Sequence, residues 1–148
     1  MKNQDKIIDD LIETLKDGQE GFKQAAEGVK DPQLKAVFDE YSRQRARFAV
    51  ELRSKAQSAD GRESEISGSA AGALHRGWIN LKSALTRGDD HAILAECERG
   101  EDSAVEEFSK ALNNGLSAPV QEMVSRQFVQ IKEAHDRVKS LRDATKKN

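Results

Sequence analysis

Apolar residues recur at alternating steps of four and three over stretches longer than twenty residues, and this spacing constrains the fold more than any other feature. In the first stretch the repeat runs from Ile8 to Val29 and is interrupted by Gln19. Such steps place side chains on one face of an α-helix, whereas a half-buried strand alternates at every second residue. The spacing therefore predicts an amphipathic helix from about residue 4 to about residue 28.

The same spacing divides the rest of the chain into further helices. We predict them over about residues 32–59, 69–88, 90–112 and 118–141, with the polar loop SADGRESEISGS after the second. The two prolines, Pro32 and Pro119, stand at predicted helix starts, where a missing N–H costs nothing. We expect an all-α domain over residues 1–148, a four-helix bundle whose shorter helix at 69–88 lies in the crossover between the second and third long helices.

Composition supports this fold class and argues against a nucleic-acid partner and a membrane span. Only 5% of residues are aromatic, which does not suit a sandwich or a barrel. The formal charge is -2, with acidic and basic residues mixed along the chain, so we predict no nucleic-acid partner. The chain lacks 18 consecutive apolar residues, so we expect no membrane span.

Cysteine usage and the opening residues indicate the compartment. Cys97 is the single cysteine, so no internal disulfide is possible. Asp9 and Asp10 interrupt the apolar residues that a signal peptide would need. We therefore expect a cytoplasmic protein.

Each long helix carries a polar residue on its apolar face near the midpoint. These residues are Gln19, Arg45, Glu101 and Gln127. Left unpaired in the core, each would cost on the order of 1 to 3 kcal/mol, and a charge would cost more. We predict a buried polar layer in which Arg45 and Glu101 form an ion pair and the two glutamines complete the hydrogen bonds. The alternative is that Arg45 extends outward along its stem while Glu101 is half exposed.

Several segments together resemble a bacterial ferritin-like family labelled only as a domain of unknown function, within the ferritin-like superfamily. The likeness covers essentially the whole chain and rests on DGQEGFKQAA at 17–26, RARFAVEL at 45–52, GSAAGALHRGW at 68–78, ECERGED at 96–102 and AHDRVKSLRD at 134–143. It implies the ferritin-like four-helix bundle with its crossover. It implies no established activity.

Ferritin-like oxidases hold two metal ions with glutamates and two Glu-x-x-His pairs, because residues i and i+3 share a helix face. The histidines of this chain are His75, His91 and His135, and the residues three positions before them are Gly72, Gly88 and Lys132. Glu-x-x-His is therefore missing from the sequence, and Arg45 adds a cation at the level where the metals would lie. We predict no catalytic, cofactor-binding or metal-binding residues, with iron as the less favoured alternative.

Three functions remain open at this point. The first is a non-catalytic bundle that forms a homo-oligomer or binds a protein partner. The second is a metal-dependent oxidase or iron-handling protein. The third is a small-molecule-binding bundle, which would have a pocket beside the polar layer.

Among single residues, we expect Trp78 to anchor the connector, Cys97 to behave as a small buried hydrophobe, and Gly21 and Gly100 to allow close helix approach.

Overall fold

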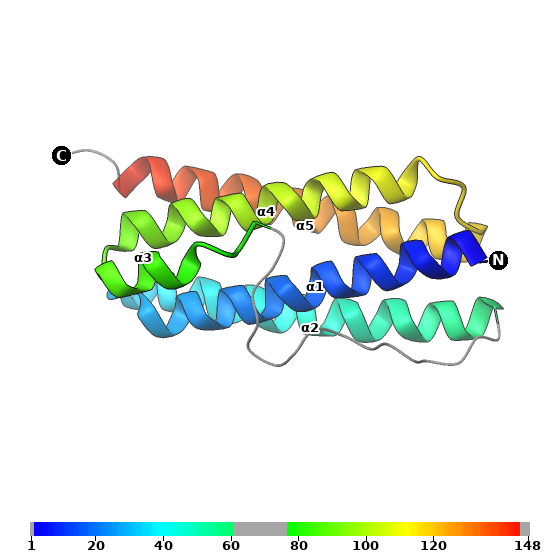
Figure 1. Cartoon of the computed structure of the whole chain (residues 1–148), viewed down its shortest axis with the longest axis horizontal. Coiled ribbons are helices and arrows are strands. Elements are labelled where there is room, and N and C mark those ends of the chain that lie inside the picture. The colour runs from blue at the N-terminus through cyan, green and yellow to red at the C-terminus, as the bar shows by residue number, and fades with distance from the viewer. Residues whose placement is uncertain (1, 61–76, 146–148) are drawn as a thin grey trace.

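The computed structural model describes residues 2–60 and 77–145, and every regular element in these two ranges is a helix (Figure 1). This confirms the all-α prediction. The helices, in chain order, are α1 (Lys2–Gly28), α2 (Pro32–Asp60), α3 (Leu81–Arg87), α4 (Asp90–Leu112) and α5 (Ala118–Thr145).

The four long helices lie side by side along a common axis, while α3 lies at one end against α4 and α1 (Figure 1). α1 packs on α2 and α4, and α5 packs on α4 and α2, which closes the bundle. α2 and α4 run in the same direction, opposite to α1 and α5 (Figure 1). None of the described helices combines the length and apolar character that crossing a membrane requires.

The α1–α2 turn is fastened to the start of α4. The backbone amides of Lys30 and Asp31 donate to the two carboxylate oxygens of Asp90 at 2.9 and 3.1 Å. Asp89 caps α4 by accepting a hydrogen bond from the His91 amide at 3.0 Å. These bonds satisfy amides that helix ends leave open, and they hold α2 and α4 level with each other.

The helix predicted at 69–88 is shorter than expected. Its first residues lie outside the described ranges, and residues 77–80 form a turn, so α3 begins at Leu81. Gly77 has φ of +89°, and a Cβ there would lie 2.7 Å from the Arg99 carbonyl oxygen. The apolar residues here have helical spacing, but close packing of residues 77–80 on α4 favours a turn over a helix.

Two other boundaries differ by a few residues. α2 continues to Asp60, so the first three residues of the predicted polar loop are helical, and the remainder lies outside the described ranges. α5 continues to Thr145, beyond the last apolar residue of its stripe. Helix ends predicted from a sequence pattern commonly differ by a residue or two from those that hydrogen bonding defines, and the end of α5 differs by more.

The core consists of two apolar clusters separated along the bundle axis. One surrounds Trp78 and includes Phe22 and Phe38, with the Phe22 and Trp78 rings edge-to-face at 5.1 Å between centroids. The other surrounds Phe108 and Leu52. The midpoints of α2 and α4 lie between the clusters, which is where the polar layer was predicted.

Candidate functional site

Arg45 of α2 and Glu101 of α4 meet at the bundle centre. The Nη1–Oε1 and Nη2–Oε2 distances are 2.6 and 2.7 Å, so the guanidinium and the carboxylate form two parallel hydrogen bonds. The side chains are only 1% and 0% exposed. The structure thus pairs these residues as predicted, and the outward position considered for Arg45 is wrong. A pair excluded from water needs this forked geometry to offset its desolvation.

The surroundings of Arg45 complete its contacts. Its Nε donates to the side-chain oxygen of Gln44 at 3.1 Å, and its guanidinium lies 5.4 Å from the centre of the Phe22 ring. A Cβ at Gly18 would lie 3.3 Å from Nη1, so a glycine on α1 leaves room for the cation. The arginine is therefore held from α1 and α2 as well as by Glu101.

The two predicted glutamines take other positions. Gln19 is half-buried, and its backbone carbonyl accepts a hydrogen bond from the Ser42 hydroxyl at 2.8 Å. Gln127 is buried, and its amide nitrogen donates to the Phe48 carbonyl at 3.1 Å. Neither glutamine bonds to Arg45; the side-chain oxygen that accepts a hydrogen bond from Arg45 belongs to Gln44 instead. The sequence pattern missed Gln44 because it lies beside the apolar stripe, next to Arg45, rather than on it.

Cys97 lies one turn before Glu101 and is fully buried. Burial raises the pKa of its thiol well above the ordinary value of 9.0, and the negative charges of Glu101 and Glu96 raise it further. The thiol is therefore neutral near pH 7, which suits a small buried hydrophobe and does not suit a nucleophile.

Trp78 anchors the turn before α3, as predicted. Its side chain is 2% exposed and fills a slot between α1 and α4. A Cβ at Gly21 would lie 2.3 Å from the indole, and a Cβ at Gly100 would lie 2.0 Å from it. The two glycines make the room that the indole occupies.

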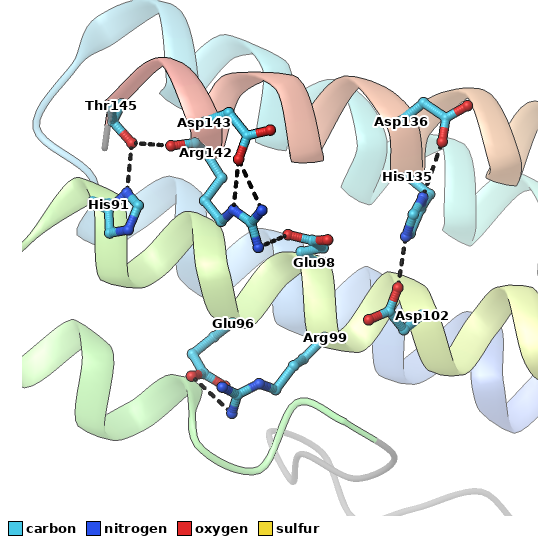
Figure 2. Close-up of polar contacts among 10 residues, drawn as sticks. All are labelled: His91, Glu96, Glu98, Arg99, Asp102, His135, Asp136, Arg142, Asp143 and Thr145. Atoms are coloured by element: carbon cyan, nitrogen blue, oxygen red, sulfur yellow. Dashed lines mark hydrogen bonds and ion pairs between the residues drawn. The ribbon is translucent and has the colours of Figure 1, made fainter. Parts of the chain in front are cut away.

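A second polar group lies at the surface between α4 and α5 (Figure 2). His135 Nε2 is 2.6 Å from Asp102 Oδ1, and its Nδ1 is 3.1 Å from Asp136 Oδ1. Burial by itself would lower the pKa of His135, but hydrogen bonds and charge interactions with Asp136 and Asp102 together raise it above 6.5. The imidazole is thus held between two carboxylates, each facing one ring nitrogen.

Glu98 extends this group by one helical turn. Its Oε1 is 2.5 Å from Arg142 Nη1, and Arg142 Nη2 is also 2.8 Å from Asp143 Oδ1 (Figure 2). One ligand-type atom from each of Glu98, Asp102 and His135 lies within 4.8 Å of the other two. We refer to these three residues as the α4–α5 cluster.

The α4–α5 cluster was not predicted from the sequence. A Glu-x-x-His pair lies within one helix, whereas this cluster joins α4 to α5. Part of the signal was present, since Glu98 and Asp102 are four residues apart and share a helix face. The spacing of apolar residues in the sequence did not specify which face of α5 lies opposite these two carboxylates.

A groove lies between α2 and α5, with a volume of about 310 Å³. Its lining residues are Arg47, Phe48, Glu51, Met123, Arg126, Gln127 and Gln130. The buried side-chain oxygen of Gln127 has no hydrogen-bond partner among the described residues. Two large apolar side chains on the same two helices are exposed, Val50 at 64% and Val129 at 56%.

Comparison with known proteins gives one family. A family model described as "Domain of unknown function (DUF2383)" matches residues 5–114. No curated protein matches the chain. The matched range includes α2, α4 and all but the first residues of α1 and ends before α5, so it contains Arg45 and Glu101 but not His135.

Proposed function

Because this chain belongs to the DUF2383 family, whose description names no activity, we propose a function from the structure itself: a non-catalytic, ferritin-like bundle that forms a homo-oligomer or binds a protein partner. The observation that carries the proposal is the buried Arg45–Glu101 ion pair. A single unpaired cysteine fits the reducing cytoplasm, which we propose as the compartment.

The residues at the bundle centre do not fit the two metal ions of a ferritin-like oxidase. The buried carboxylates of the described residues are Asp17, Glu96 and Glu101, and both oxygens of Glu101 accept hydrogen bonds from Arg45. The described histidines, His91 and His135, lie at the surface near α5. Two divalent ions beside a fixed guanidinium would have too few negative ligands to offset their charge.

The α2–α5 face supports binding to another polypeptide. Val50 lines a surface hollow together with Met123 of α5, and Phe48 and Met123 line the groove between the two helices. Exposed apolar side chains that gather on one face mark interaction sites more often than scattered ones do. We propose this face as the contact.

The test of assembly is sedimentation velocity of the full chain over a wide concentration range. We expect a dimer or larger oligomer that dissociates in Val50→Asp. Ile79→Asp is the matched control, since Ile79 is 66% exposed but belongs to the turn at 77–80, which packs on α4. A strict monomer that also fails to retain any protein on an affinity column would contradict the proposal.

The test against an oxidase uses iron directly. Protein purified without chelator is analysed for iron, and aerobic oxidation of added Fe²⁺ is followed. We expect no oxidation above the rate in buffer. Stoichiometric iron together with turnover that is lost in Glu101→Gln would overturn the proposal in favour of iron chemistry.

The groove supports a second candidate, binding of a small molecule. It lies beside Gln127, as the small-molecule hypothesis requires, and the unpartnered oxygen of Gln127 would accept a hydrogen bond from a ligand. Arg47 and Arg126 favour a ligand that also carries a negative charge. Thermal-shift screening with aromatic and aliphatic carboxylic acids tests this, and a hit that Gln127→Leu does not weaken would place the ligand elsewhere.

A further inference from the structure

We propose that the α4–α5 cluster of Glu98, Asp102 and His135 is a surface site for one Zn²⁺ ion, held by two carboxylates and one imidazole. Nitrogen and oxygen ligands of this kind are within the chemistry of zinc, which takes three protein ligands and a water molecule in open sites. The site is separate from the bundle centre and from the α2–α5 face.

The backbone already brings the three ligand atoms to nearly the required spacing. Zinc ligands lie about 2.0 to 2.2 Å from the metal, so ligand atoms around a tetrahedral ion are about 3.3 Å apart. Here they lie within 4.8 Å of one another, and Asp102 Oδ1 is 2.6 Å from His135 Nε2. Small rotations of the side chains, with no change in the helices, would bring the carboxylates and the imidazole around an ion.

Asp136 supplies the contact that metal-binding histidines usually make with their second nitrogen. Its Oδ1 is 3.1 Å from Nδ1 of His135 (Figure 2). A carboxylate in this place keeps a proton on Nδ1, so that loss of the Nε2 proton, which Asp102 accepts as a hydrogen bond here, frees the Nε2 lone pair for the metal.

The neighbouring cation, Arg142, has an alternative partner. It pairs with Glu98, but it also donates to Asp143 through Nε at 3.2 Å and Nη2 at 2.8 Å. When Glu98 turns toward an ion, Arg142 keeps both hydrogen bonds to Asp143. Asp102 is 60% exposed, so a hydrated ion reaches the site from solvent without any opening of the bundle.

The experiment is calorimetric titration of the full chain, stripped of metal and of any affinity tag, with Zn²⁺. We expect one ion per chain. His135→Ala should reduce binding to the background level, and Asp136→Asn should weaken it about tenfold because the histidine loses its orienting partner. Titration with Co²⁺ should give visible absorption bands in the natural protein but not in His135→Ala.

The matched control is His91→Ala. His91 also bridges α4 and α5, through a 2.9 Å contact with the Thr145 hydroxyl, but it lies outside the α4–α5 cluster. We expect this variant to bind Zn²⁺ as the natural protein does. Circular dichroism checks that each variant is folded, and Asp102→Asn provides a second test if His135→Ala is not. Absence of stoichiometric Zn²⁺ binding would refute the site. Equal loss of binding in His91→Ala and His135→Ala would also refute it, since the ions would then bind adventitiously.

Discussion

Glu101 and Asp102 are consecutive residues of α4 with the same charge, yet they lie in opposite environments. Glu101 is fully buried and holds Arg45 with both oxygens, whereas Asp102 is 60% exposed and contacts the edge of His135. A helix turns by about a quarter to a third of a circle per residue, which is enough to move one carboxylate from the core to the surface. The comparison shows how position on a helix, rather than residue type, decides what a carboxylate does.

The two environments also differ in what a lost partner costs. A buried charge without its partner keeps its full desolvation penalty, whereas an exposed one is solvated by water. Removing one partner of the Arg45–Glu101 pair should therefore cost far more stability than removing one partner in the α4–α5 cluster.

Breaking the buried pair should have the largest effect. Glu101→Leu leaves the Arg45 cation buried, and we expect a loss of about 3 to 5 kcal/mol in the free energy of unfolding. Urea unfolding followed by Trp78 fluorescence measures it. Arg45→Met together with Glu101→Leu should recover most of the loss, because no buried charge remains. A double variant as unstable as the single one would show that the pair acts through shape and not charge.

Filling the slot next to the pair should have a smaller effect. Gly100→Ala places a Cβ where the Trp78 indole lies, 2.0 Å away, and we expect a loss of about 1 to 3 kcal/mol by the same measurement. Gly18→Ala gives a comparison, since its nearest contact, the Arg45 side chain at 3.3 Å, needs to shift by only a few tenths of an ångström, and we expect a smaller loss. Gly100→Ala without a loss would mean that Trp78 can leave its slot at no cost.

Removing the surface carboxylate should change stability little. Asp102→Asn weakens the contact with His135, and we expect a loss below about 1 kcal/mol in the metal-free protein. The unfolding experiment used for Glu101→Leu gives the direct comparison. A loss as large as that of Glu101→Leu would remove the distinction between the two environments.

A change of pH between 7 and 8 should have the smallest effect, and it concerns the thiol of Cys97. Burial raises the pKa of Cys97, so between pH 7 and pH 8 we expect no change in its reaction with a thiol reagent in the folded protein. Because the folded-state pKa is the higher one, the contribution of the thiol to stability is complete below pH 9.0 and is lost as pH rises above that value. Rapid labelling of Cys97 in the native protein would show that the core opens at this point.

The sequence predicted the helices and the buried pair because both depend on helical phase. Arg45 and Glu101 interrupt apolar stripes near the middle of their helices, and the structure brings them together. Gln19 illustrates the limit of this reasoning, since it is half-buried and its neighbour Gly18 is the residue of α1 that lies against Arg45. The turn at 77–80 was wrongly predicted as helix because its conformation is fixed by contact with α4 rather than by local spacing.

By itself, the sequence determined the all-α class, the approximate limits of the long helices and the residues that face the core, since these follow from a 3.6-residue period acting within each segment. Only the tertiary structure decided that Gln44, rather than Gln19 or Gln127, completes the contacts of Arg45. It also decided that His135 lies against Asp102 and Glu98. Contacts between helices depend on their relative rotation and axial shift, and these are set by packing of the whole core.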